Sequence, residues 1–198
     1  MLGRFAMSNV KCTGALLRPI AFGAVLLLAS ASSTAVPNEP RRWVAPPVGY
    51  YAPDRISARL LAAHNRERAS VNVPPLRWDP SLAASAASYG PSLSSLGGLR
   101  HSPRGNRPGQ SENLWMGTRG AFAPEQMVGS WIEERQYFRP GTFPYVSKTG
   151  NWLDVGHYSQ LIWRATTAVG CAIHRDARFE YLICRYSPKG NVDGKLVA

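Results

Sequence analysis

The chain has 198 residues, and 23 lysines and arginines against 12 acidic residues give it a formal net charge of +11 at pH 7. A chain of this length can form one domain with a sizeable core, and its charge favours anionic surfaces such as lipid headgroups or cell-wall polymers. The bases are scattered and lack the interleaved aromatic residues of a single-strand binder, so we expect no nucleic-acid partner.

Residues 1–35 are typical of a secretory signal peptide. Three bases precede an apolar run over residues 20–29, and small residues suited to cleavage follow. The run is about half of the roughly 20 residues that a membrane span needs, and no other segment is apolar enough, so we do not expect an integral membrane protein. Removal of this segment takes away three bases and no acids, which leaves a charge of +8. We expect a secreted protein, which is extracellular or, in a Gram-negative bacterium, periplasmic.

Residues 36–53 are rich in proline and predict an extended lead-in to a domain over residues 54–198. A helix is expected directly after Asp54, because apolar residues recur there near helical spacing. His64 and Glu67 lie one turn apart on this helix. We expect them to stabilise the fold rather than to bind a metal, since no HExxH motif accompanies them.

The second predicted helix begins at Pro80, with Asp79 as its cap, and ends at Gly90-Pro91. Serine, glycine, proline and arginine dominate residues 92–111. We therefore expect a long loop over that range.

A third helix is expected from Pro124 to about Phe138. Met127, Trp131 and Glu134 share one stripe of it, so an acid lies on the face that should contact the core. An acid in that position often bonds a histidine or the backbone of a loop.

An aromatic loop rich in proline and glycine follows over residues 138–152, and then a short helix, because Tyr158, Leu161 and Ile162 have helical spacing. Two β-rich runs around the turn-like sequence RDAR predict a C-terminal hairpin. His174 is expected to be exposed on that hairpin.

The two cysteines that remain after removal of the signal peptide, Cys171 and Cys184, are expected to form a disulfide. A hairpin centred between Ala177 and Arg178 places them directly opposite each other. Opposed residues at a non-hydrogen-bonded position are close enough for the bond. The alternative is a pair of free buried thiols.

Several motifs together resemble the CAP superfamily of cysteine-rich secretory proteins, venom allergens and plant pathogenesis-related proteins, which share the SCP domain. The motifs are GHYSQLIW followed by VGCA, ENLW after an upstream HS, WIEERQY, and a terminal CRYSPKGN. They occur in the family's order over roughly residues 55–192. The resemblance implies an α+β fold, an α-β-α sandwich with a small antiparallel sheet between helical layers.

The resemblance also implies a central cavity lined by His101, Glu112, Glu134 and His157. His101 and His157 would be the ligands of Zn²⁺ or another divalent cation, with the carboxylates orienting ligands or acting as bases. The alternative is that the carboxylate–histidine pairs only satisfy one another inside the fold.

Family resemblance favours a non-enzymatic binding module for sterol or another lipid, which acts in defence or virulence. Phe138, Phe143 and Tyr145 of the aromatic loop are expected to border the lipid groove, unless they form a small satellite core. The alternative function is a metal-assisted, protease-like hydrolase that uses the histidines and glutamates. No GxSxG motif or other recognisable nucleophile is present in the sequence, and we name no catalytic residue.

Overall fold

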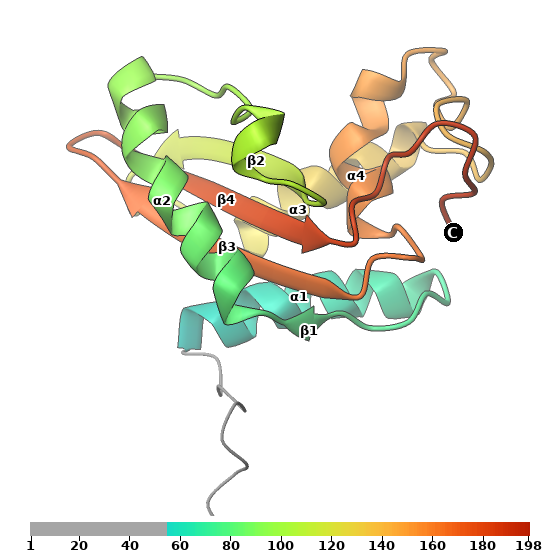
Figure 1. The fold of residues 1–198 in the computed structure, drawn as a ribbon, viewed down its shortest axis with the longest axis horizontal. Coiled ribbons are helices and arrows are strands. Elements are labelled where there is room, and N and C mark those ends of the chain that lie inside the picture. The colour runs from blue at the N-terminus through green and yellow to red at the C-terminus, as the bar shows by residue number, and fades with distance from the viewer. Residues whose placement is uncertain (1–54) are drawn as a thin grey trace, which may run out of the picture. The chain divides into compact units, whose positions relative to one another are not determined.

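The computed structural model describes residues 55–198, so the expected signal peptide and the lead-in lie outside the described residues (Figure 1). Helices and short strands alternate along this range. Their bounds, with η for a 3₁₀ helix, are α1 Arg55–Ser70, β1 Arg77–Trp78, α2 Pro80–Leu96, η1 Arg104–Asn106, β2 Ser111–Thr118, α3 Pro124–Ile132, η2 Glu133–Tyr137, η3 Trp152–Val155, α4 Gly156–Leu161, β3 Ala168–Arg175 and β4 Phe179–Ser187. None of these helices is long and apolar enough to cross a bilayer.

The strands form one four-stranded sheet in the order β1-β3-β4-β2. β3 and β4 make the expected C-terminal hairpin, and β2 pairs with the other edge of β4, both in antiparallel register. β1 contributes only Arg77 and Trp78, which pair in parallel with β3. The expected antiparallel sheet is confirmed for three strands, and the fourth is a short parallel edge.

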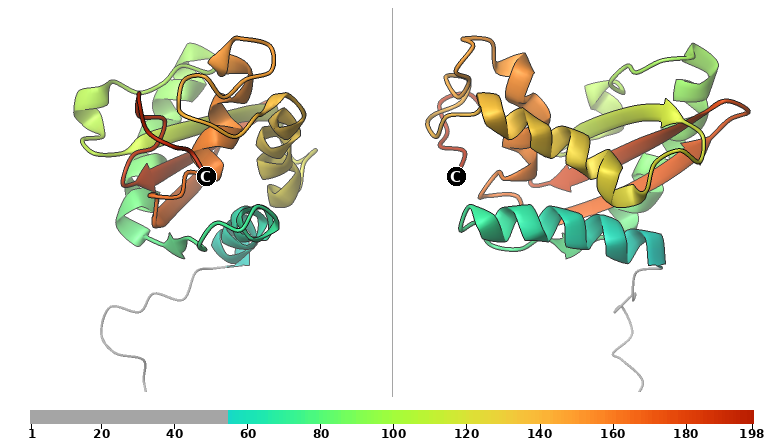
Figure 2. Two further views of the ribbon diagram at one scale, coloured as in Figure 1. Left: turned by 90° about the vertical axis from the view of Figure 1, so that its right-hand side faces the viewer. Right: turned by 180° about the vertical axis from the view of Figure 1, so that it is seen from behind.

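Helices cover both faces of the sheet, as Figure 2 shows. Alternate residues of a strand point to opposite faces, and β4 is buried on both. Tyr181 and Ile183 pack in one cluster with residues of α2. Leu182, Cys184 and Tyr186 pack in a second cluster with residues of α1, α3 and α4. The α-β-α sandwich of an α+β domain is therefore confirmed.

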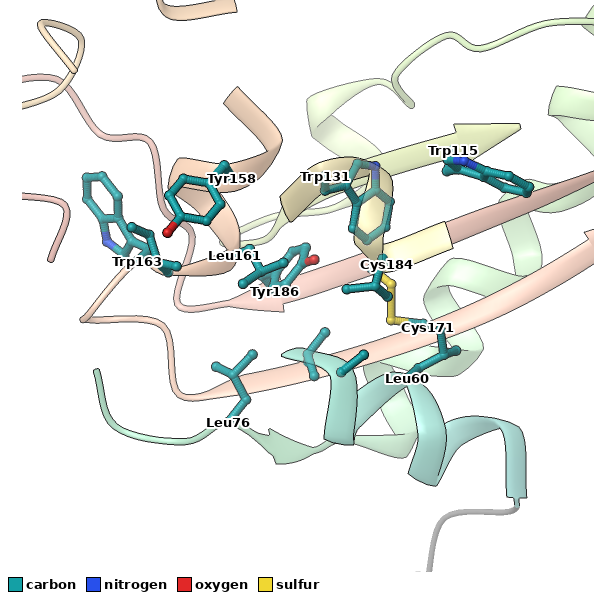
Figure 3. Packing of buried hydrophobic residues seen from close by; sticks show 14 of the residues in the cluster. Leu60, Leu76, Trp115, Trp131, Tyr158, Leu161, Trp163, Cys171, Cys184 and Tyr186 are labelled. Carbon is teal, nitrogen blue, oxygen red and sulfur yellow. A yellow bond between two sulfur atoms is a disulfide. The ribbon is translucent and has the colours of Figure 1, made fainter. Parts of the chain in front are cut away.

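His64 of α1 is fully buried and lies beside Trp131 and Tyr186 of the second cluster. Figure 3 shows the packing of that cluster. Its Nδ1 lies 2.8 Å from the Leu60 carbonyl oxygen, which can only accept, so Nδ1 carries the proton. Its Nε2 therefore accepts from the Tyr186 hydroxyl at 2.8 Å. Both ring nitrogens are satisfied, and the expectation that His64 stabilises the fold agrees with these contacts.

The expected disulfide is present. Cys171 and Cys184 are direct register partners in the β3–β4 hairpin, with Cα atoms 4.1 Å apart, and their sulfur atoms are bonded. Figure 3 shows this bond among the buried side chains. The bond holds the two central strands of the sheet together.

The predicted end of the second helix is wrong, because α2 continues through Gly90 and Pro91 to Leu96. Gly90 is needed for close packing: a Cβ at this position would lie 2.4 Å from Cβ of His174 on β3. The helix ends instead at Gly97, whose φ of 64° is the left-handed conformation that glycine adopts readily. His174 is consequently half-buried against α2 rather than exposed.

The third predicted helix begins at the expected residue, but its second part is a 3₁₀ helix rather than an α-helix. It is α-helical from Pro124 to Ile132 and continues as the 3₁₀ helix η2 to Tyr137. The segment expected to be one long loop, residues 92–111, contains the end of α2, the helix η1 and the first residue of β2.

Arg68 of α1 anchors the segment that follows α4. Its fully buried guanidinium donates hydrogen bonds of 2.7 to 3.0 Å to the backbone carbonyls of Pro74, Leu161, Trp163 and Thr166. Burial lowers the pKa of Arg68 to about 10, so it stays charged. This contact fixes the position of the C-terminal end of α4 relative to α1.

Candidate functional site

Glu134 and His157 form the first carboxylate–histidine pair of the site. His157 Nδ1 lies 2.6 Å from Glu134 Oε1. Glu134 Oε2 accepts the backbone N–H groups of His157 and Tyr158, each at 3.0 Å. The acid on the apolar stripe of the third helix therefore caps the first turn of α4 and orients the His157 ring at the same time. Trp131 stacks on that ring with centroids 6.0 Å apart.

His101 and Glu112 form the second pair. His101 Nδ1 lies 2.7 Å from Glu112 Oε1, which also accepts the backbone N–H of Ser102 at 3.0 Å. The Glu112 side chain is fully buried, whereas the His101 side chain is 56% exposed. The pair thus places a buried carboxylate behind an accessible imidazole.

Arg185 forms a buried ion pair with Glu112, the carboxylate of the second pair. Glu112 and Arg185 are direct register partners on β2 and β4, and Arg185 Nη1 lies 3.0 Å from Glu112 Oε2. The same Nη1 donates to Ser102 Oγ at 2.8 Å, and the guanidinium lies over the Tyr89 ring. Burial raises the pKa of Glu112, but the donors around its carboxylate and the charge of Arg185 together hold that pKa below its usual value.

This role of Arg185 was not predicted from the sequence, in which it is one of the scattered bases. The sequence does indicate that Arg185 is paired, because it lies inside the apolar run YLICRY of β4, where a buried arginine needs a partner. The identity of that partner depends on the β2–β4 register, which the sequence does not reveal.

One cavity of about 800 Å³ opens in front of both histidines. Its lining contains His101, Glu112 and His157 but not Glu134, which lies behind His157. The remaining lining residues are Arg104, Arg107, Gly109, Gln110, Ser111, Asn113, Phe143, Pro144, Trp152, Leu153, Gly156, Gln160, Lys189, Gly190, Asn191, Val192 and Asp193. The structure thus brings three of the four expected cavity residues to one surface and places the fourth directly behind it.

The carboxylate partners determine the tautomer of each neutral imidazole ring. A carboxylate that holds no proton accepts only, so each neutral ring donates from Nδ1 and keeps a lone pair on Nε2. Among residues 55–198, neither Nε2 atom has a hydrogen-bond partner. This is the carboxylate–histidine arrangement that orients imidazole for a metal ion.

The three aromatic residues expected at a lipid groove have different environments. Phe143 is buried and lines the cavity. Phe138 is half-buried and packs edge to face on Tyr158, away from the lining. Tyr145 is 75% exposed and also lies outside the lining. The aromatic wall of the cavity is instead completed by Trp152, whose ring centroid is 5.2 Å from that of Phe143.

Gln160 of the GHYSQ motif is buried and belongs to the cavity lining. Its Oε1 accepts the backbone N–H of Gly190 at 3.0 Å, and its Nε2 donates to Thr166 Oγ1 at 3.2 Å. A Cβ at Gly190 would lie 2.6 Å from Gln160 Oε1 and 2.7 Å from Trp163 Cγ. Gln160 thereby holds the segment after β4 against α4.

A second group of metal-ligating atoms does not form a metal site. A ring nitrogen of His64 and the sulfur atoms of Cys171 and Cys184 lie within 4.8 Å of one another. The two sulfur atoms are bonded to each other in the disulfide, and both ring nitrogens of His64 already have hydrogen-bond partners. The trio therefore offers no free ligand in the oxidised protein.

Comparison with known proteins identifies the family. The model of the cysteine-rich secretory protein family, CAP, matches residues 61–186. The pathogenesis-related protein PRMS of Zea mays is 34% identical over 139 residues, which cover 68% of this chain and 77% of that protein. Pathogenesis-related protein 1C of Nicotiana tabacum is 36% identical over 137 residues, or 68% and 76% of the two chains. The secreted protein RBT4 of Candida albicans is 33% identical over 144 residues, which cover 71% of this chain and 37% of RBT4.

Solved structures share the fold. The crystal structure of NaASP2 with Zn²⁺ matches with a TM-score of 0.63 and 23% identity, over 74% of this chain and 89% of that chain. The structure of BmVAL-1 matches with a TM-score of 0.63 and 21% identity, over 76% and 84% of the two chains. Together with the family match, these likenesses show that the chain belongs to the CAP family of cysteine-rich secretory proteins.

Proposed function

We propose that the chain is a non-enzymatic binding module whose cavity holds a divalent cation at His101 and His157 and takes up a sterol or another lipid. One observation carries this proposal. Two imidazoles, each oriented by a glutamate through Nδ1, line the same open cavity of about 800 Å³. That volume lies within the range of roughly 300 to 1,000 Å³ that is common for small-molecule sites.

The donor set fits a borderline-soft cation such as Zn²⁺. Imidazole nitrogen is one of its preferred ligands, and a tetrahedral ion held by two protein nitrogens keeps positions for water or a ligand. NaASP2, which has the same fold, was crystallised with Zn²⁺. Two protein ligands are fewer than the three that usually hold a catalytic zinc, so we expect modest affinity.

The composition of the cavity wall supports an apolar ligand. Phe143, Pro144, Trp152 and Leu153 contribute apolar surface to the cavity lining. The rest of the lining is largely polar and includes Arg104, Lys189 and Gln160, so the cavity offers an apolar stretch for a hydrocarbon and polar groups for a headgroup or hydroxyl. The aromatic loop thus contributes to the proposed lipid site through Phe143 rather than through Phe138 or Tyr145.

A metal-assisted hydrolase is the weaker alternative, because neither glutamate is in a good position to act as a base. The Glu112 side chain is fully buried and paired with Arg185, and both Glu134 oxygens are bonded to the α4 backbone or to His157. A general base must reach the water or group that it deprotonates. Ser102 Oγ and Ser159 Oγ bond partners other than histidine, so neither of these serines is paired with a histidine base.

The proposed setting is secretion and a role in defence or virulence. The N-terminal sequence has the pattern of a signal peptide, and the disulfide fits an oxidising compartment. Relatives named pathogenesis-related proteins and a secreted protein support this setting. An anionic cell surface is the partner that the charge of the chain favours.

Native mass spectrometry of the exported, processed protein tests the proposal. We expect a retained divalent ion on the parent protein and a lipid adduct after incubation with sterol or fatty acid. The ion should be lost from a His101→Ala/His157→Ala variant and kept by His174→Ala, the matched control on the β3 strand. A parent protein that never carries a metal or a lipid would contradict the proposal.

A further inference from the structure

Four large apolar side chains are exposed on two segments of the described domain that meet near Phe143. Tyr145, Leu153 and Leu196 are 75%, 63% and 63% exposed, and Trp152 is 39% exposed. These four residues, called the apolar rim here, include the three most exposed large hydrophobic side chains in residues 55–198. Contiguous exposed apolar groups of this kind mark interaction sites.

The members of the rim come from two segments that meet at Phe143. The Phe143 N–H donates to the Lys195 carbonyl at 2.9 Å, and Thr142 forms a β-bridge with Leu196. The Phe143 ring also packs on Trp152. Figure 2 shows the orange segment around residues 140–155 beside the red C-terminal segment. The two segments that carry the rim therefore lie side by side.

Positive charge surrounds the rim. Residues 139–154 and 189–198, together with the facing segment 100–107, contain seven lysines and arginines against two aspartates. Arg104, Lys189 and Lys195 are exposed. Arg104 and Lys189 share the cavity lining with Trp152 and Leu153. Exposed aromatic and aliphatic side chains surrounded by basic residues are typical of proteins that bind anionic membranes. The basic residues contact the phosphate headgroups, and the apolar side chains insert at the boundary between the headgroups and the acyl chains.

We propose that the apolar rim docks the protein on the surface of an anionic lipid bilayer, with the mouth of the cavity facing the membrane. Trp152 and Leu153 belong both to the rim and to the cavity wall, so docking brings the cavity opening to the lipid surface. A lipid then passes between bilayer and cavity without crossing water, whose contact with the acyl chain is unfavourable. The docking surface stands on exposure and charge alone, and only this transfer rests on the proposed lipid-binding function.

A site-specific label tests the docking. The exported protein without residues 1–35 lacks Cys12, and its other two cysteines are joined in the disulfide, so one introduced cysteine can be labelled uniquely. Leu196→Cys carries an environment-sensitive NBD group on the rim, and Leu96→Cys on α2, 47% exposed, is the matched control. With vesicles of phosphatidylcholine and phosphatidylserine, we expect a blue shift and a rise in NBD emission at 196 and no change at 96. Phosphatidylcholine alone should give a smaller response, and added salt should weaken binding to the mixed vesicles.

Cosedimentation with the same vesicles measures the contribution of the rim. Tyr145→Ser/Leu196→Ser should lower the vesicle partition coefficient at least about tenfold, whereas Ile56→Gln/Leu96→Gln should not. All four side chains are exposed, and an unchanged melting temperature verifies folding. Equal partitioning of both variants, or an equal response of both labels, would overturn the proposal. A blue shift at 196 without vesicles that grows with protein concentration would assign the rim to self-association instead.

The two proposals can fail separately. Binding of a fluorescent sterol presented in cyclodextrin, without vesicles, reports on the cavity alone, and Tyr145→Ser/Leu196→Ser should bind it like the parent. Sterol binding without vesicle binding refutes the docking and leaves the proposed function intact. Vesicle binding without sterol uptake refutes the proposed lipid-binding function and leaves the docking surface intact.

Discussion

Arg185 and Glu112 face each other across the β4–β2 ladder, with Arg185 Nη1 3.0 Å from Glu112 Oε2 and both side chains buried. Glu112 in turn holds His101 through its other oxygen. The buried charge of Arg185 thus stabilises the carboxylate that orients the His101 ring at the cavity surface. Removal of one partner from such a pair leaves an uncompensated buried charge, which is far more costly than loss of the pair as a whole.

We therefore predict that Arg185→Met lowers the free energy of unfolding by about 3 kcal/mol or more. The double variant Arg185→Met/Glu112→Gln should regain much of this loss, because no unpaired charge remains. Arg59→Met is the control: its partner Glu125 lies 2.6 Å away, but both side chains are partly exposed, and we expect a much smaller cost because water screens the pair. Urea unfolding of the four proteins measures these differences. Equal losses in the single and double Arg185 variants would refute the pairing.

We predict that the burial of His64 makes the folded protein less stable in mild acid. Burial lowers the pKa of His64 to about 4 in the folded protein, from 6.5 in the unfolded chain. Below pH 6.5 the unfolded chain binds a proton that the folded protein does not, so the stability that is complete above this pH falls as pH decreases toward 4. The shift corresponds to about 3 kcal/mol by pH 4. Denaturant melts across this range should show the slope in the parent and a much flatter one in His64→Gln, and parallel slopes would disprove the assignment.

The disulfide should stabilise the domain mainly through the unfolded state. Cys171 and Cys184 are separated by 13 positions, and closure of a loop of that size contributes about 3 kcal/mol in the chain-entropy model. Cys171→Ala/Cys184→Ala should lose about this amount in urea unfolding. The parent protein should resist alkylation until it is reduced. Alkylation of both thiols in the untreated protein would contradict the bond.

The cavity wall can be tested with a soluble lipid probe. Trp152→Ala removes apolar surface from the wall, and we expect at least about tenfold weaker binding of a fluorescent sterol in solution. Tyr145→Ala should bind like the parent, because Tyr145 lies outside the lining. Phe143→Ala is a poor probe, since Phe143 is buried against two tryptophans and its loss would destabilise the domain. Equal binding by the Trp152 and Tyr145 variants would remove this wall from the lipid site.

Short motifs allowed the fold and much of the cavity to be predicted. GHYSQ, ENLW and the Trp-x-x-Glu spacing singled out His157, Glu112 and Glu134: the first two line the cavity, and Glu134 lies behind His157. What could not be predicted depends on contacts between distant segments. Arg185 acquires its role only from the strand register, and Gly90 is a packing residue because His174 of β3 lies against it. Local rules interpret a Gly-Pro pair as a helix end, and here tertiary packing overrides them.

Titration calorimetry with Zn²⁺ is the most direct test of the central claim, that two glutamate-oriented imidazoles form a cation site in the cavity. The chain has four histidines, of which His101 and His157 line the cavity. The parent and His174→Ala should bind one equivalent with the same affinity. His101→Ala and His157→Ala should each bind more weakly, and the double variant should not bind at all. Retention of the parent affinity by the double variant would contradict the account.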